Sequence, residues 1–194
     1  MMKRNNFPFS AVLGLNHAKT AILIVLVNPR AGGLLISGPR GIGKSTLMRS
    51  TQELIERPWR DIPVSVTEDR LFGTIDTEKA IYSGQKKLYP GIINEADQGV
   101  LYLDDANLLR EDLLDFILNI AEVGAYQLER DGLSLRCDTS FTVIAAINPE
   151  SGMLSGACLD QFGLFVNVDN IHDENTRVEI LKRTISFEKD CASF

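Results

Sequence analysis

The chain has 194 residues, of which 44% are hydrophobic and 24% charged, and its formal net charge is −6. This composition is typical of one soluble globular domain, and the acidic balance gives no electrostatic reason to expect nucleic acid or an anionic membrane as the partner. The three cysteines lie far apart without metal-ligand spacing, so we expect neither a disulfide framework nor a zinc site, and a reducing, cytoplasmic location fits best.

The first predicted helix covers residues 16–27. Its apolar run TAILIVLVNP, residues 20–29, is too short to span a bilayer and is flanked by polar residues, so we expect a buried helix and no membrane span. The opening MMKRNNFPF carries two positive charges but no apolar segment or cleavage pattern follows closely, so no signal peptide is predicted.

Short apolar runs alternate with helical patterns along the rest of the chain. Strands separated by helices indicate an α/β domain in which a five-stranded parallel sheet is covered on both faces. The last predicted helix has Asp173 as its N-cap. The predicted strands are 33–37, 62–66, 99–104, 141–147 and 164–168, and the further predicted helices are 43–56, 108–123 and 174–187.

Two segments do not fit a plain α/β unit. Residues 71–98 contain glycine breaks and a proline, and we expect them to form a helical or strand excursion before the central strand. Residues 124–140 place the pair Asp131 and Gly132 between two alternating runs, a pattern that predicts a β-hairpin. The hairpin is therefore expected as an insertion in the α/β fold.

The segment GPRGIGKS, residues 38–45, matches the phosphate-binding pattern G-x-x-x-x-G-K-[ST] between a predicted strand and a predicted helix. Its glycines let backbone N–H groups turn toward a phosphate, and the helix adds its positive dipole end. Lys44 is expected to reach the β- and γ-phosphates, and the Ser45 hydroxyl to bind Mg²⁺. The predicted ATP- or ADP-binding residues are Gly38, Pro39, Arg40, Gly41, Ile42, Gly43, Lys44, Ser45 and Thr46.

Two later strands lead into polar side chains. Asp104 ends the strand at 99–104 and is expected to share the Mg²⁺ with Ser45, while Asp105 follows where a water-activating acid is expected. A later apolar strand leads to Asn148, whose amide is predicted to bind the attacking water and a γ-phosphate oxygen. Acids after a strand also begin ordinary loops, and Asn before Pro is a common turn starter. On spacing alone, both the catalytic interpretation and the loop or turn interpretation of these residues stay open.

Collinear blocks over nearly the whole chain resemble the ATPase core of the magnesium-chelatase I-subunit type within the AAA+ superfamily. The most specific block is TEDRLFGTIDTEKA at 67–80, because most P-loop proteins lack it. The other blocks are at 7–14, 28–46, 89–109, 128–136 and 148–164.

This resemblance implies a P-loop αβα sandwich and a ring, usually a hexamer, whose neighbouring subunits share each nucleotide site. In the chelatase, ATP hydrolysis drives Mg²⁺ insertion into a tetrapyrrole by a separate catalytic subunit, with a third subunit as platform. The resemblance therefore implies chelatase-like platform and catalytic subunits as partners.

Four departures from the family matter, and the first two of them bear on turnover. Asp105 stands where the family has Glu, and a carboxylate set back by about 1 Å can cost roughly 10²-fold in rate. Gln161 occupies the position of the arginine finger, which is worth roughly 10³ to 10⁵ in turnover, and Arg130 is one candidate substitute. The link before residue 67 is short, and the family's helical lid is not found, so we expect residues 1–194 to form a single core domain.

The leading interpretation is an ATP-binding AAA+ motor subunit, weakly active alone, that couples ATP hydrolysis to metal insertion by partner subunits. The alternative is a hydrolysis-deficient scaffold subunit of a mixed ring, in which ATP acts as a structural ligand. A P-loop kinase is a weaker third interpretation, because such an enzyme would not need the block at 67–80 or the hairpin.

Overall fold

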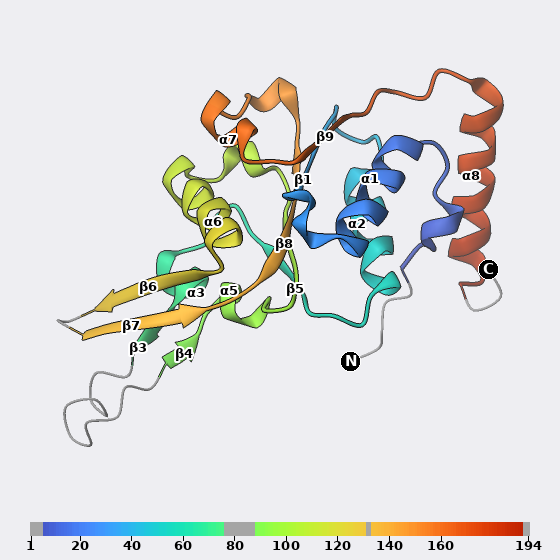
Figure 1. Ribbon diagram of the computed structural model, residues 1–194. Coiled ribbons are helices and arrows are strands. Elements are labelled where there is room, and N and C mark those ends of the chain that lie inside the picture. The colour runs from blue at the N-terminus through green and yellow to red at the C-terminus, as the bar shows by residue number, and fades with distance from the viewer. Residues whose placement is uncertain (1–5, 76–87, 131–132, 192–194) are drawn as a thin grey trace.

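A five-stranded parallel sheet forms the centre of the computed structural model, which describes residues 6–75, 88–130 and 133–191 (Figure 1). The strand order is β2-β5-β8-β1-β9, and every pairing within this sheet is parallel. Parallel pairing brings the carboxyl ends of β5, β8 and β1 to one edge, side by side. The strands are β1 (Leu34–Ser37), β2 (Trp59–Ile62), β5 (Gly99–Leu103), β8 (Phe141–Ile147) and β9 (Leu164–Asn167).

Helices cover both faces of this sheet, which confirms the predicted α/β fold. Alternate strand residues point to opposite faces: Ile36 and Ile144 join the apolar cluster under α1 and α2, whereas Leu35 and Val143 join the cluster under α3, α5 and α6. The α-helices are α1 (Asn16–Val27), α2 (Lys44–Thr51), α3 (Glu68–Phe72), α5 (Ile92–Glu95), α6 (Glu111–Val123), α7 (Gly156–Asp160) and α8 (Glu174–Lys189).

Short 3₁₀ turns adjust several helix ends relative to prediction. The predicted helix at 43–56 ends as an α-helix at Thr51, and the one predicted from 108 begins at Glu111. The predicted cap of α8 is confirmed, because Asp173 Oδ2 accepts the Thr176 N–H at 2.8 Å. The 3₁₀ turns are Phe9–Ala11, Pro29–Ala31, Gln52–Leu54, Ala106–Leu108 and Pro149–Ser151.

The prediction of a strand at 62–66 is wrong in position, because the strand lies earlier in the chain. β2 covers Trp59–Ile62, with the two terminal side chains buried and Arg60 and Asp61 exposed between them. Pro63 has no N–H to donate to a neighbouring strand, so the ladder stops before it. Within the described part of the chain, β2 is an edge strand that pairs with β5 alone, and an edge tolerates charged side chains in mid-strand.

The prediction that α1 is a buried helix holds for one face only. Ala18, Ile22 and Val25 are fully buried against the sheet, but Ile24 is 45% and Val27 84% exposed. A helix of 3.6 residues per turn presents only one side to the sheet it covers. Among the described residues, no helix is both long enough and apolar enough to cross a membrane.

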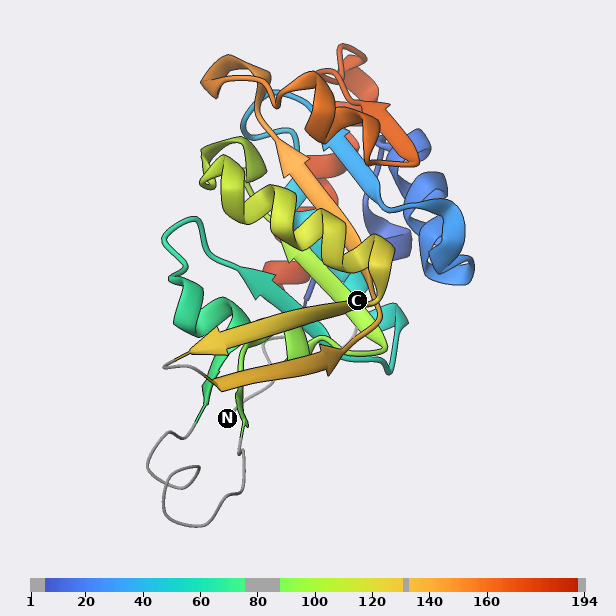
Figure 2. The same ribbon diagram turned by 60° about the vertical axis from the view of Figure 1, so that its left-hand side comes forward.

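Both predicted insertions form antiparallel pairs of strands (Figure 2). β6 (Ala125–Arg130) and β7 (Leu133–Asp138) confirm the hairpin, although its turn residues 131–132 lie outside the described part. The excursion at 71–98 contains α3, α5 and the strands β3 (Gly73–Ile75) and β4 (Leu88–Pro90), while residues 76–87 lie outside the description. Tyr126 ties the two insertions together, because its hydroxyl lies 2.8 Å from Phe72 O and 2.7 Å from Asn94 Oδ1.

Candidate functional site

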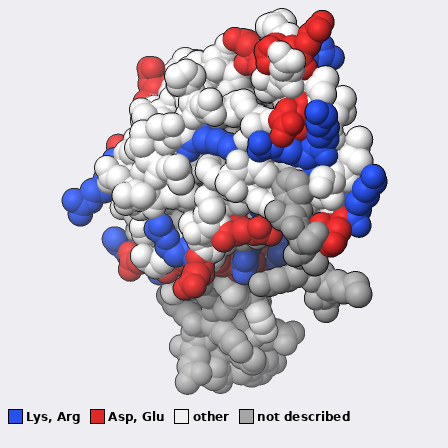
Figure 3. Space-filling model, turned by 90° about the vertical axis from the view of Figure 1, so that its right-hand side faces the viewer, with Lys and Arg blue, Asp and Glu red and all other residues white. Residues whose placement is uncertain are grey.

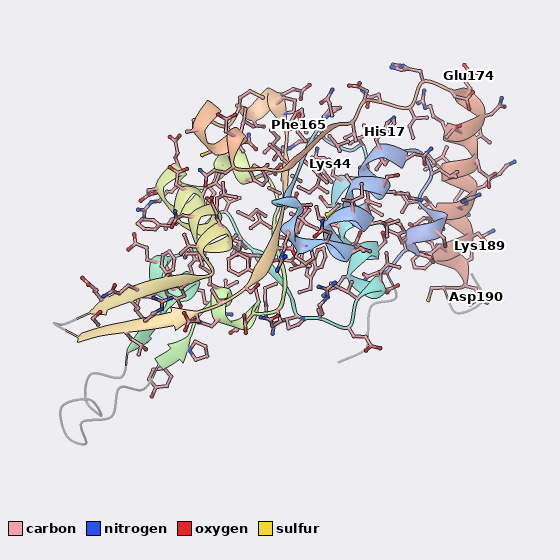
Figure 4. All side chains as sticks on the ribbon, viewed as in Figure 1. His17, Lys44, Phe165, Glu174, Lys189 and Asp190 are labelled. Carbon is pink, nitrogen blue, oxygen red and sulfur yellow. The ribbon has the colours of Figure 1, made fainter. Side chains whose placement is uncertain are left out.

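The predicted phosphate loop, residues 38–45, leads from the carboxyl end of β1 into α2, and Figure 4 shows Lys44 at this junction. At Gly38 an added Cβ would lie 2.5 Å from Val168 O, so the close approach of two backbones excludes any larger residue. Gly43 caps α2 with a φ of 98°, a conformation that favours glycine. Both glycines of the pattern are thus required by the backbone of the loop.

Lys44 lies inside the loop and is 7% exposed. Its Nζ donates to Gly38 O at 2.5 Å and to Pro39 O at 2.9 Å. Burial lowers the pKa of the ammonium from its ordinary value of 10.5, and the nearby Asp105 and Asp104 carboxylates oppose that shift. The cation is therefore held at the base of the site by the loop's own carbonyl groups.

Ser45 and Asp104, the predicted metal ligands, are brought together although 59 residues separate them: Ser45 Oγ donates to Asp104 Oδ2 at 2.9 Å. Hydroxyl and carboxylate oxygens are ligands that Mg²⁺ accepts, and two adjacent ligands of an octahedral Mg²⁺ lie about 3 Å apart. The observed separation therefore fits a shared Mg²⁺.

Tyr102 is a site residue that the sequence reasoning missed. Its hydroxyl donates to Asp104 Oδ1 at 2.9 Å, which fixes the carboxylate and leaves Oδ2 toward Ser45. Burial, and then the Asp104 charge, raise the pKa of Tyr102, so the phenol stays protonated as a donor. The available signal was the strand period of two, which turns residue 102 of β5 and residue 104, just after the strand, to the same side.

A cavity of about 270 Å³ opens over these groups. Asp105 lines it in a left-handed conformation (φ 50°, ψ 48°), which is rare for a residue other than glycine and occurs more often at functional sites. Arg40 Nη2 lies 3.8 Å from Asp105 Oδ2. The cavity brings together most of the predicted site residues, namely Arg40, Gly41, Gly43, Lys44, Ser45, Thr46, Asp104 and Asp105.

Asn148 follows β8, at the same edge of the sheet, but its amide is occupied locally. Its Oδ1 accepts the Glu150 N–H and its Nδ2 donates to Ser151 Oγ, both at 3.2 Å. Asn107, which follows the acidic pair, donates to Asn148 O at 3.3 Å and so connects the ends of β5 and β8. Asn148 is 2% exposed and does not line the 270 Å³ cavity.

A second cavity, of about 940 Å³, adjoins the phosphate loop and was not anticipated from the sequence. Residues 11–15 and α8 form its walls, and Ile42 of the loop lines it together with Gly41 and Gly43. Arg183 of α8 donates to Ala11 O at 3.2 Å, which holds the two walls together. On the face that carries α8, basic and acidic side chains are interspersed (Figure 3). No local sequence pattern could announce this cavity, because its walls come from opposite ends of the chain.

Gln161 lies at the opposite edge of the sheet from the phosphate loop. It lies three residues before the start of β9, whose first residue Leu164 pairs in parallel with Leu34, the first residue of β1, whereas the loop follows the end of β1. Gln161 is exposed and lines a separate cavity of about 540 Å³. A side chain at position 161 therefore cannot reach the chain's own phosphate loop. The side chain of Arg130, the candidate substitute, lies outside the described residues.

Comparison with known proteins gives concordant matches. An AAA-domain family model of the dynein-related subfamily matches residues 33–161. The magnesium-chelatase 38 kDa subunit of Cereibacter sphaeroides is 36% identical over 97% of this chain and 66% of its own length. Magnesium-chelatase subunit ChlI of Cyanophora paradoxa is 33% identical over 100% of this chain and 68% of its own length. A cryo-EM-based structure of the complex between subunits BchI and BchD of magnesium chelatase matches at 36% identity, with a TM-score of 0.80, over 96% of this chain and 68% of that chain.

The chain spans about two thirds of the length of these proteins. The two sequence alignments run over 221 and 236 residues, which is more than the 194 residues of this chain. These relatives therefore carry residues within the aligned span that this chain lacks.

Proposed function

Because the chain belongs to the AAA family and, within it, to the family of magnesium-chelatase ATPase subunits, we propose that it binds ATP with Mg²⁺ and hydrolyses it slowly as a motor subunit. The observation that carries this proposal is the 2.9 Å contact between Ser45 Oγ and Asp104 Oδ2, beside a Lys44 buried within a glycine-rich loop. A hydroxyl, a carboxylate and an ammonium gathered at a glycine-rich loop before a helix form a site suited to a magnesium triphosphate.

In this proposal each part of the site has one task. The loop N–H groups and Lys44 bind the phosphates, and Ser45 and Asp104 hold Mg²⁺, which when bound neutralises charge on the phosphate oxygens. Asp105 accepts a proton from the attacking water, and Asn148 orients that water once its amide leaves the turn at Glu150. The 940 Å³ cavity next to the loop is large enough for a nucleoside.

Two residues support slow turnover by the isolated chain. Asp105 is one methylene shorter than the family's Glu, so its carboxylate sits farther from the water. Gln161 carries no charge at the position that faces away from the chain's own site, so it offers a neighbouring subunit no guanidinium.

We further propose a ring assembly, hexameric by analogy with the family, in which residues 1–194 form one AAA+ core domain. One matched structure is a complex between two magnesium-chelatase subunits, which supports chelatase-like platform and catalytic subunits as partners. Metal insertion into a tetrapyrrole would be performed by the catalytic partner and driven by this chain's ATP hydrolysis. A cytoplasmic location fits the three free cysteines.

Nucleotide binding and mass in solution test this function together. Calorimetry of the purified chain is expected to show binding of ATP and ADP in the presence of Mg²⁺, weakened by EDTA. Light scattering is expected to show a larger mass with ATP and Mg²⁺ than without them, because a ligand bound between subunits favours the assembled state. A folded protein with no affinity for either nucleotide would contradict the proposed function.

A second candidate function is the nucleotide-dependent scaffold, favoured by the same Asp105 and Gln161. Phosphate release separates the two functions. A motor subunit releases phosphate slowly alone and faster when mixed with a catalytically complete chelatase ATPase subunit. A scaffold binds ATP tightly and assembles, but it releases no phosphate in either setting.

The burial of Lys44 predicts a pH dependence of ATP binding. Because its pKa is lowered from the ordinary 10.5, Lys44 loses its proton and ATP affinity falls at a lower pH than for an exposed lysine. Bound phosphate favours the charged ammonium, so binding at alkaline pH should take up protons. Calorimetry in two buffers of different ionisation enthalpy measures this uptake. Proton release, or an affinity that stays constant up to pH 10.5, would contradict the assignment.

A further inference from the structure

Arg40 is a cation of the phosphate site to which the proposed function gives no individual role. Among the residues that line the 270 Å³ cavity, the cations are Lys44 and Arg40. They differ in accessibility, since Lys44 is 7% exposed whereas the Arg40 side chain is 73% exposed. Lys44 is held by two loop carbonyls, so Arg40 is the cation that can move when a ligand enters.

The Arg40 guanidinium lies next to Asp105, the acid proposed to accept a proton from water. The distance of 3.8 Å between Arg40 Nη2 and Asp105 Oδ2 is longer than a hydrogen bond, and the Asp105 side chain is 31% exposed. Such a solvent-exposed pair is weak, so an anion of higher charge can replace the carboxylate. Arg40 therefore lies at the end of the cavity where water is to be activated.

Arg40 places a cation next to the site of water activation, and position 161 at the opposite edge of the sheet offers no cation to such a site in a neighbouring subunit. Gln161 precedes β9 and is neutral, so no charge reaches a neighbouring site from that position. A guanidinium matches the geometry of a phosphate and can donate two parallel hydrogen bonds to it. ATP differs from ADP by its terminal phosphate, and this phosphate would be the one nearest to Asp105.

We propose that Arg40 senses the terminal phosphate in cis: its guanidinium leaves Asp105 for that phosphate, which favours ATP over ADP and frees the Asp105 carboxylate. This inference rests on the proposed function, because it assumes that the cavity binds nucleoside di- and triphosphates. Arg40, the third residue of GPRGIGKS, would then determine the preference for ATP over ADP at the site of its own subunit. Arg40 is exposed, so its replacement removes no buried contact and leaves folding intact.

Equilibrium binding tests the inference without relying on turnover. Calorimetry with ATP and with ADP, each with Mg²⁺, compares the wild type, Arg40→Ala and the control Arg30→Ala, in which an exposed arginine is removed near the opposite edge. We expect Arg40→Ala to weaken ATP binding about 10-fold and ADP binding less than twofold, the size of one charge-assisted hydrogen bond. Arg30→Ala should change neither affinity.

The other outcomes distinguish failure of the Arg40 role from failure of the proposed function. Equal losses for ATP and ADP, or no loss for ATP, would overturn the sensing role while the proposed function stands. A wild type that binds neither nucleotide would remove the proposed function, and the inference with it.

Asp105→Asn tests the exchange of partners. It should raise ATP affinity about twofold to fivefold, because Arg40 then has no carboxylate to leave, and this gain should be smaller in the Arg40→Ala background. An equal gain in both backgrounds would show charge repulsion alone and overturn the exchange.

Discussion

Lys44→Ala is expected to weaken the binding of ATP with Mg²⁺ by at least about 100-fold, to below detection in a calorimeter. The ammonium is the buried positive charge of the site, held by the carbonyls of Gly38 and Pro39. Its removal takes away the charge that faces the β- and γ-phosphates and leaves both carbonyls without their donor. Titration calorimetry of the variant with ATP and with ADP measures the loss.

A matched control is Lys182→Ala, which removes an exposed lysine from α8. It should bind ATP within about twofold of the wild type. Circular dichroism and thermal unfolding establish that both variants are folded. Near-normal ATP affinity in a folded Lys44→Ala variant would show that the glycine-rich loop is not the phosphate site, and the proposed function would then fail.

Gln161→Arg is expected to raise ATP turnover by about 10-fold or more, and only in the assembled protein. Position 161 lies at the opposite edge of the sheet from its own phosphate loop, so a new guanidinium there can reach only the site of a neighbouring subunit. An arginine supplied to a neighbour in this way is worth roughly 10³ to 10⁵ in turnover. The gain expected here is smaller, because Asp105 remains the shorter acid.

Phosphate release over a range of protein concentrations measures this effect. The rate per subunit of Gln161→Arg should rise with concentration and match the wild type at high dilution, where the chain is monomeric. Gln127→Arg places the same charge at an exposed site on the hairpin and should leave the rate unchanged. A gain that does not depend on concentration would contradict action in a neighbouring subunit.

The geometry of the candidate phosphate site was largely predictable because its parts are encoded locally. The spacing of Gly38, Gly43, Lys44 and Ser45 is a property of eight consecutive residues. Asp104 could be added because a parallel sheet collects the residues that follow its strands at one edge, and the 2.9 Å contact with Ser45 follows from that rule. The hairpin and the cap of α8 were predicted for the same reason, since turn and cap residues act within a few positions of themselves.

The incorrect or missing predictions concern contacts between segments that are distant in the sequence. β2 covers 59–62 rather than the apolar run at 62–66 because Pro63 has no N–H to donate to the ladder, and its first residue Trp59 packs against Tyr102 of the next strand, with ring centroids 6.0 Å apart. Local propensity favoured the run, but burial between strands decided the register. The exposed face of α1 went unpredicted because composition does not tell which side of a helix is covered.

The sequence by itself determined that this chain has a glycine-rich loop between a strand and a helix, an acidic strand end, a hairpin insertion and an alternating α/β order, because each is a pattern of neighbouring residues with a local physical cause. Only the tertiary structure decided that the Tyr102 hydroxyl donates to Asp104, that Arg40 lies beside Asp105, that Gln161 lies at the opposite edge of the sheet from its own loop and that residues 11–15 and α8 enclose a second cavity. Those contacts join segments separated by tens of residues or more, or depend on how a side chain turns. Packing of the whole chain selects them, and no short stretch of sequence contains the information.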